Sequence, residues 1–309
     1  MREASTHLIY DLAKKDTRVM ALTADGRNAA YERIKDELPN QYVDYGIAEQ
    51  NMVASAAGMA SCGKIPFIFG TSTFLAMRAF EFIRNDVCIP NMNVKFIGIF
   101  SGLSRPAWGA THQGTEELAL LRCLPNIQVI TPSTPIMARE ATRWAYEHKG
   151  PVYIRLEASG ETEHYDDSYR FIPGKAHELM PVEGKTDITL ITMGAIADSA
   201  INLVNKLSEE GIRCQIIDMP TVKPIDRDII CQYIEEESVI VTIEEHSRYG
   251  GLGSAVAEVI AESGKGTRFC RIGLEGCAHG CGSRESVRKA NKINMGGGVY
   301  EIVTKLLID

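Results

Sequence analysis

The sequence lacks the features that would place it in a membrane or on nucleic acid. No run of about 18 apolar residues occurs, so no segment is expected to cross a bilayer as a helix. Lys and Arg form no stripe and the formal net charge is -7, which argues against a surface that neutralises phosphates. The opening residues MREASTHLIYDLAKK predict an amphipathic helix and not a signal peptide. We therefore expect a cytoplasmic protein.

Signatures of nucleotide and metal binding are also scarce. GxxxxGK[ST] is absent, and GGLGSA (250–255) before a predicted helix is a weak match to GxGxxG, with close packing as the alternative. ATP-dependent and NAD-dependent enzymes are thereby disfavoured. Cys277 and Cys281 flank His279 in GCAHGCGS, but a fourth ligand is missing nearby, so a glycine-rich loop is favoured over a metal site. We expect this chain to hold no metal by itself.

The sequence does contain strands and helices in regular alternation. Short apolar runs such as VMALTA, IPFIFG, NVKFIGIF and PVYIRL are separated by helical periodicity, a pattern typical of parallel sheets covered by helices. A polar stretch with Gly and Pro follows, and a second series of the same kind comes after it. The prediction is an α/β protein of two doubly wound domains at residues 1–158 and 187–309, joined by a linker at 159–186.

Two side chains stand out as chemical candidates. Glu49, in DYGIAEQNM, lies between an apolar run and the small-residue segment NMVASAAGMA, which predicts a buried helix. A carboxylate in such a place needs a partner or stays protonated, since its desolvation costs several kcal/mol. His112, in the glycine-rich turn GATHQGTEEL, is expected at the carboxyl edge of a sheet, where open α/β sheets bind ligands. A solvated or capping histidine is the alternative.

The order of several motifs indicates a family. GIAEQNMVASAAGMA, STFLAMRAFEFIR, GATHQGTEELALLRCLPNIQV, IDMPTVKPID and EEHSRYGGLGSAVAEV follow one another along nearly the whole chain. The sequence resembles the pyrimidine-binding and C-terminal domains of transketolases, and in particular the C-terminal subunit of split, two-chain transketolases. The related 1-deoxyxylulose-5-phosphate synthases share these domains.

The resemblance implies thiamine diphosphate as the cofactor and assigns roles to five residues. The family's glutamate at the Glu49 position bonds the aminopyrimidine nitrogen and favours the tautomer that activates the cofactor. Phe74 matches the aromatic that stacks on the pyrimidine, and Phe80 a second aromatic position with a plain core residue as the alternative. Asp25 matches an acidic residue near the cofactor at the subunit boundary. His112 matches the histidine that contacts the donor sugar.

The substrate side departs from the family's pattern. Trp108 falls where transketolases place an acidic residue for a donor hydroxyl, and Phe100 where they place a further histidine. Ala158 falls on a phosphate-binding arginine, whereas Arg2 matches another phosphate-side arginine, and Arg105 is a candidate replacement. Because the lost groups would make charge-assisted bonds of about 1.5 to 3 kcal/mol each, an ordinary pentose-phosphate donor becomes doubtful.

The resemblance also implies a partner. The family holds the diphosphate through magnesium or another divalent metal on a GDG motif with a later asparagine, and ADGRN (24–28) is only an approximation of it. We therefore expect an N-terminal transketolase-like subunit that carries the diphosphate-binding domain, in a heterotetramer of two copies of each chain. The expected activity is transfer of a two-carbon unit from a ketose-type donor to an aldehyde. The alternatives are a 1-deoxysugar or other 2-oxoacid-decarboxylating synthase, and a non-catalytic binding subunit.

Overall fold

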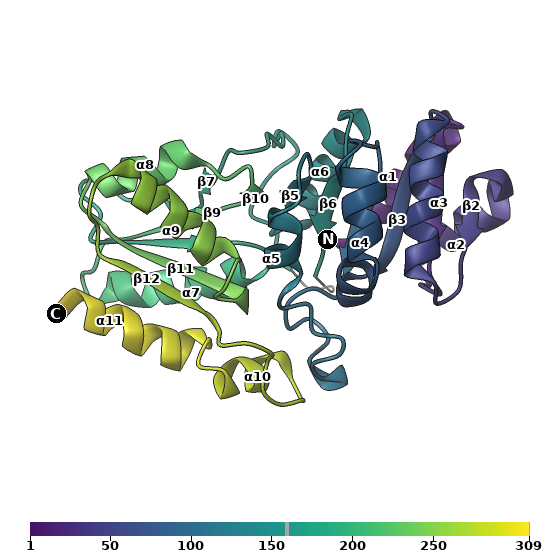
Figure 1. Ribbon diagram of the computed structural model, residues 1–309. Coiled ribbons are helices and arrows are strands. Elements are labelled where there is room, and N and C mark those ends of the chain that lie inside the picture. Colours follow the sequence, from purple (N-terminus) through teal and green to yellow (C-terminus); the bar gives the residue numbers. More distant parts are fainter. Residues whose placement is uncertain (158–160, 309) are drawn as a thin grey trace. The chain divides into compact units, whose positions relative to one another are not determined.

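The chain folds into two compact α/β units, shown in Figure 1. The computed structural model describes residues 1–157 and 161–308. The first unit contains Met1–Ser101 and Leu120–Ile172, and the second contains Gly102–Ala119 and Pro173–Asp309. None of the described helices has the length and hydropathy needed to cross a membrane.

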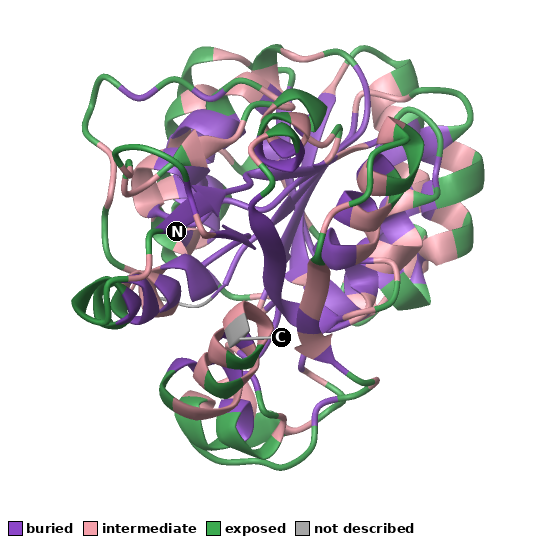
Figure 2. Ribbon diagram, turned by 90° about the vertical axis from the view of Figure 1, so that its left-hand side faces the viewer, coloured by how far each residue is buried: buried purple, intermediate pink, exposed green. Residues whose placement is uncertain are grey.

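The first unit is built on a parallel sheet. Six of its strands lie in the order β5-β6-β4-β3-β1-β2, and each neighbouring pair runs parallel. Nearly every residue of the central strands is buried (Figure 2), as expected for a parallel sheet covered on both faces. The strands are β1 (Val19–Thr23), β2 (Tyr42–Asp44), β3 (Ile65–Thr71), β4 (Lys95–Ile99), β5 (Gln128–Ile130) and β6 (Val152–Arg155).

Two groups of helices cover this sheet. One group packs through α1, which contacts both α2 and α6, and the other packs around α3. The predicted N-terminal amphipathic helix is confirmed as α1. Capping residues mark the helix starts where the sequence supplies them: the side chain of Asn28 accepts from Ala30 N before α2, and that of Thr134 from Met137 N before α6. The helices are α1 (Arg2–Lys15), α2 (Ala29–Glu37), α3 (Glu49–Ser61) and α6 (Pro135–Glu147), with a 3-10 turn η1 (Pro39–Gln41). Helix α5 (Glu117–Arg122) begins in the second unit and ends in the first.

The segment FLAMRAFEFIRNDV differs from the regular helix that its periodicity predicts. It forms two π-helical turns, η2 (Phe74–Arg78) and η3 (Ile83–Cys88), on either side of the short helix α4 (Phe80–Phe82). A π-helical turn holds an extra residue, which rotates the side chains that follow it relative to a regular helix, and such turns are frequent at functional sites. Hydrophobic periodicity does not distinguish these turns from an α-helix.

The second unit has a five-stranded sheet in the order β12-β11-β8-β9-β7. Its strands are parallel except for β7, which pairs antiparallel with β9. Helix α9 packs on β11 and β12 and also contacts α8 (Figure 1), while α7 and α11 both contact η5. The elements are β7 (His177–Glu178), β8 (Ile188–Thr192), α7 (Ile196–Glu209), β9 (Cys214–Asp218), β10 (Thr221–Lys223), α8 (Arg227–Glu235), β11 (Val239–Ser247), α9 (Leu252–Ser263), β12 (Phe269–Leu274), α10 (Arg284–Ala290), η5 (Met295–Val299) and α11 (Tyr300–Ile308).

One segment belongs to a different unit from its neighbours in sequence. Residues 102–119, which follow β4 and include the 3-10 turn η4 (Pro106–Trp108), pack with the second unit. Their Leu103 is fully buried within the apolar core of that unit. The segment that contains GATHQ is therefore positioned by the C-terminal half of the chain.

Candidate functional site

Four predicted site residues of the first unit follow the carboxyl ends of its strands. Asp25 lies just after β1, Glu49 opens α3 after β2, Phe74 follows β3, and Phe100 follows β4 directly. Because these strands are parallel, their carboxyl ends share one edge of the sheet. This is the edge at which open α/β sheets bind ligands.

Glu49 has a partner that the sequence interpretation missed. Its side chain is 5% exposed, and Nη1 of Arg78 donates to Oε2 of Glu49 over 2.6 Å. The guanidinium carbon of Arg78 also lies 4.9 Å from the centre of the Phe74 ring, a cation–π contact. Arg78 therefore joins the two residues that were expected to hold the pyrimidine. The spacing of four residues between Phe74 and Arg78 in FLAMR was the available signal.

Asp25 and Phe100 share an unusual backbone conformation. Their φ angles are 56° and 60°, in the left-handed region that side chains other than glycine rarely adopt. The amide of Asp25 donates to Oδ1 of Asp44 over 3.1 Å, which ties the end of β1 to that of β2. Strained backbone of this kind concentrates at functional sites. The conformation marks the same edge of the sheet as Glu49 does.

The substrate-side candidates of the second unit form one aromatic cluster. The His112 ring lies edge-on to the Trp108 ring, with centroids 4.8 Å apart, and the Arg105 guanidinium lies 4.8 Å from the centre of the Trp108 ring. Oγ1 of Thr111 lies 2.9 Å from Nδ1 of His112. Trp108 is 53% exposed, so this cluster presents an aromatic side chain to solvent. The contacts with Thr111 and Trp108 orient the His112 ring.

The remaining candidates have less distinctive places. Phe80 begins α4 and is half-buried. Arg2 begins α1, with Nη2 at 3.8 Å from Oε1 of Glu3. Ala158, where a phosphate-binding arginine was expected to be lost, lies outside the described residues.

The structure explains the glycines of GGLGSA by close packing. The Glu244 carboxylate accepts from the amides of Leu252 and Gly253, each over 2.8 Å, at the start of α9. A Cβ atom at Gly251 would lie 2.1 Å from Oε2 of Glu244. An internal carboxylate thus takes the position at the helix N-terminus that a bound phosphate would occupy. The glycines of GGLGSA therefore serve close packing, as expected, and not nucleotide binding.

Comparison with protein families identifies both halves of the chain. The family described as "Transketolase, pyrimidine binding domain" matches residues 1–159, and "Transketolase, C-terminal domain" matches residues 176–294. The chain belongs to the transketolase family. The predicted resemblance and the predicted α/β fold of two domains are both confirmed.

Relatives and solved structures include separate transketolase subunits. The chain is 34% identical over 281 residues to an apulose-4-phosphate transketolase subunit of Phocaeicola vulgatus, covering 90% of this chain and 89% of that protein. A solved split gene transketolase, described as an inactive β4 tetramer, is 36% identical to this chain, with a TM-score of 0.89. The match covers 99% of this chain and 98% of the solved chain. The 1-deoxy-D-xylulose-5-phosphate synthase of Halothermothrix orenii is 34% identical over 268 residues, which are 85% of this chain and 41% of that enzyme.

Membership in this family implies dependence on thiamine diphosphate, and the first unit fits the aminopyrimidine of that cofactor. The flat Arg78 guanidinium already hydrogen-bonds Glu49 and lies over Phe74, as an aminopyrimidine would do through its edge and its face. Within residues 1–157 and 161–308, no group of three or more His, Cys, Asp or Glu side chains is placed to hold a metal ion.

Proposed function

We propose that this chain is the C-terminal subunit of a two-chain, thiamine diphosphate-dependent transketolase. It transfers a two-carbon ketol unit from a ketose-type donor to an aldehyde-type acceptor, and it acts only with an N-terminal subunit that binds the diphosphate and the metal. The complex contains two copies of each chain and works in the cytoplasm.

The match to separate subunits over nearly their full length carries this proposal. The chain covers 89% of the transketolase subunit of Phocaeicola vulgatus and 98% of the solved split-gene chain. That solved chain is described as an inactive β4 tetramer. A C-terminal subunit without its partner is therefore expected to assemble and yet to be inactive, and the same behaviour is proposed here.

Each site residue has a proposed role that its match to the transketolase family implies. Thiamine diphosphate supplies the carbanion chemistry when bound. Glu49, buried at the start of α3, hydrogen-bonds the pyrimidine ring nitrogen and exchanges a proton with it, and Phe74 packs on the pyrimidine face. Asp25 and Phe80 line the cofactor site. His112 donates to a donor-sugar oxygen.

The substrate end of the proposed site is more apolar than in transketolases that bind phosphorylated pentoses. Trp108, Phe100 and Arg105 face the donor, and Arg2 provides a positive charge on the phosphate side. An aromatic wall penalises a hydroxylated donor that must lose its water against it. The preferred donor is therefore less polar, or less dependent on its phosphate, than xylulose 5-phosphate.

Reconstitution tests the proposal. The chain is assayed alone, and then mixed with the product of an adjacent gene of similar length that carries GDG and NN motifs, in each case with thiamine diphosphate and magnesium. The mixture should transfer a ketol unit in a donor screen and elute at the size of two copies of each chain. Each subunit alone should be inactive. Full turnover by this chain alone would refute the two-chain proposal.

A decarboxylating synthase is the second candidate function. The synthase of Halothermothrix orenii is as similar in sequence as the transketolase subunit of Phocaeicola vulgatus, at 34% identity in both cases. Such an enzyme uses a pyruvate-like donor, and Trp108 would be a suitable neighbour for a small, apolar group. Release of carbon dioxide from pyruvate by the complex, with no ketol transfer from sugars, would favour this function. A complex that does neither, while still binding the cofactor, would contain this chain as a non-catalytic binding subunit.

A further inference from the structure

The loop GCAHGCGS and the residues around it have no role in the site described above, yet they contact the 102–119 segment, which carries Trp108 and His112. Sγ of Cys277 donates to Oε1 of Glu116 over 3.2 Å. On the same loop, the amide of Gly282 donates to the carbonyl of Pro106 over 3.4 Å. A Cβ atom at Gly109 would lie 3.3 Å from Sγ of Cys281, so the segment and the loop approach closely here.

A buried ionic cluster holds the beginning of the same segment. Oε2 of Glu245 accepts from the amide of Leu103 over 3.0 Å. Arg284 binds the Glu245 carboxylate with both Nε and Nη2, the closest contact being 2.6 Å, and Nε of Arg288 adds a third donor at 2.6 Å. Nη1 of Arg288 also donates to Oγ of Ser199 on α7. The Glu245 carboxylate therefore connects the 102–119 segment to α10 and, through Arg288, to α7.

The charge on Glu245 is favoured despite its burial. The side chain is 1% exposed, and burial alone would raise its pKa, but the guanidinium groups of Arg284 and Arg288 lower the pKa to about 2. Gly102 fits this arrangement because its φ of 58° suits glycine and a Cβ atom there would lie 2.8 Å from Oε2 of Glu245. A larger residue at this position would crowd the Glu245 side chain.

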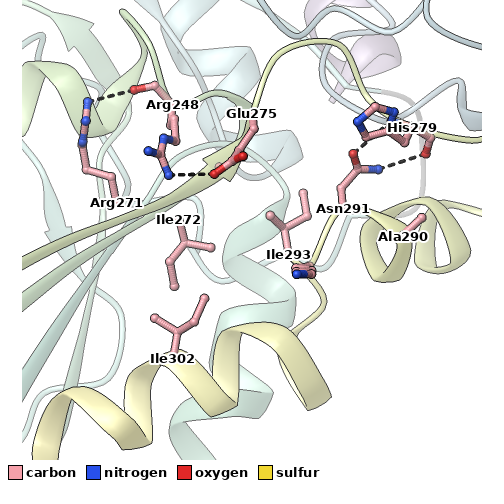
Figure 3. Close-up of a pocket in the computed structure, with 11 residues that line it drawn as sticks. Arg248, Arg271, Ile272, Glu275, His279, Ala290, Asn291, Ile293 and Ile302 are labelled. Atoms are coloured by element: carbon pink, nitrogen blue, oxygen red, sulfur yellow. Dashed lines mark hydrogen bonds and ion pairs between the residues drawn. The ribbon is translucent and has the colours of Figure 1, made fainter.

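The loop is itself anchored on its other side. Figure 3 shows Glu275 paired with Arg248, with Oε1 at 3.1 Å from Nη1, and Asn291 bound to both the amide and the carbonyl of His279 at 2.9 and 3.0 Å. These residues line a pocket of about 290 Å³ whose polar groups largely satisfy one another. The bonds between Asn291, at the end of α10, and His279 hold the loop against α10 (Figure 3).

We propose that Glu245, held by Arg284 and Arg288, is a positioning residue for the donor substrate. It acts, together with the loop GCAHGCGS (276–283), by fixing the position of the 102–119 segment. The proposal rests on the proposed function, in which His112 contacts the donor. Cys277 serves as a second, weaker attachment through Glu116. Neither Glu245 nor Cys277 touches the substrate.

Arg284→Ala in the reconstituted complex tests this role, with Arg213→Ala as the matched control. Arg213 binds Asp187 through Nε and Nη2 in the same unit, at 3.2 and 2.8 Å. In Arg284→Ala, hydrogen exchange should increase in peptides covering residues 102–119 and not in α9. The KM for the donor should rise, or kcat/KM should fall, by about tenfold or more, since small displacements of substrate-positioning groups are costly. Arg284→Lys should recover part of both effects, and Arg213→Ala should show neither.

A milder variant guards against a general loss of folding. Cys277→Ala should raise exchange around Glu116 with a smaller kinetic effect, while Cys62→Ala, which removes an exposed cysteine of the first unit, should leave both unchanged. Unchanged exchange in residues 102–119 in both Arg284→Ala and Cys277→Ala would overturn the proposal. Increased exchange with unchanged kinetics would also overturn it, because the segment would then be held for another reason. A wild-type complex without transferase activity would instead refute the proposed function. Hydrogen exchange in residues 102–119 would then still show whether Arg284 and Cys277 hold this segment.

Discussion

Arg78 donates a 2.6 Å hydrogen bond to Glu49 and lies over the Phe74 ring, so one cation contacts both residues proposed to hold the pyrimidine. A buried carboxylate without a partner is costly, and the pairing with Arg78 offsets that cost. If Glu49 binds the aminopyrimidine as proposed, Arg78 has to share or leave the carboxylate. Binding of the cofactor and release of Arg78 are therefore expected to be linked.

Glu49→Gln in the reconstituted complex should reduce turnover by orders of magnitude while leaving the fold intact. An amide cannot exchange a proton with the pyrimidine nitrogen, although it has the same shape as the carboxyl group. Steady-state kinetics and circular dichroism measure the two effects. Glu140→Gln is the control, because Glu140 is a similarly buried carboxylate of the first unit with arginine neighbours. A loss of only two- or threefold would mean that Glu49 is structural.

Arg78→Met should lower the apparent melting temperature of the isolated chain. The change removes a charge-assisted hydrogen bond worth about 1.5 to 3 kcal/mol from a buried acceptor, and the lower value is expected because Arg78 is 37% exposed. Combining it with Glu49→Gln should cost less than the sum of the two single changes, since the carboxylate that lost its partner is gone. Strict additivity in thermal unfolding would show that the two side chains are not coupled.

Trp108→Asp should shift donor preference toward xylulose 5-phosphate. A carboxylate at this position can accept from a donor hydroxyl, and such a charge-assisted bond is worth about 1.5 to 3 kcal/mol, or about ten- to 150-fold in kcat/KM. The substitution should cost little stability because Trp108 is 53% exposed. Tyr249→Asp, at another exposed aromatic of the second unit, should leave the preference unchanged. If the wild-type complex already uses xylulose 5-phosphate efficiently, the expected polarity of the site is wrong.

Lys95 should make the stability of the chain depend on pH. Its side chain is fully buried, Nζ donates to the carbonyls of His148 and Gly150, and burial lowers its pKa to about 7. The unfolded chain keeps this proton up to about pH 10.4, so the unfolded state binds more protons between these values and stability rises with pH there.

The comparison with Lys95→Met isolates this contribution. From about pH 7 to 9, the wild-type chain should gain up to about 1.4 kcal/mol per pH unit relative to Lys95→Met. Unfolding in urea at several pH values measures the difference. Lys64→Met is the control, because Lys64 donates to the carbonyl of Thr17 from an exposed position. Parallel pH profiles for wild type and Lys95→Met would contradict the expected effect.

The sequence predicts the parallel sheets and their order along the chain because buried parallel strands are continuous apolar runs, as in β1 and β4. It also places Glu49 at the start of a helix, since small residues follow it. The π-helical turns could not be predicted, because the inserted residue leaves the apolar spacing nearly helical. The partnership of Glu49 with Arg78 could not be predicted either, since it depends on a turn and a helix that are separate in sequence.

The placement of residues 102–119 has a consequence for dissecting the chain into fragments. The chain passes from one unit to the other after Ser101, returns after Ala119, and passes again after Ile172. A single cleavage near Ile172 would therefore leave Leu103 on a fragment that lacks Glu245 and the apolar core around it. An N-terminal fragment made in this way would expose a buried leucine and an unbonded amide, and we expect it to aggregate where the intact chain does not.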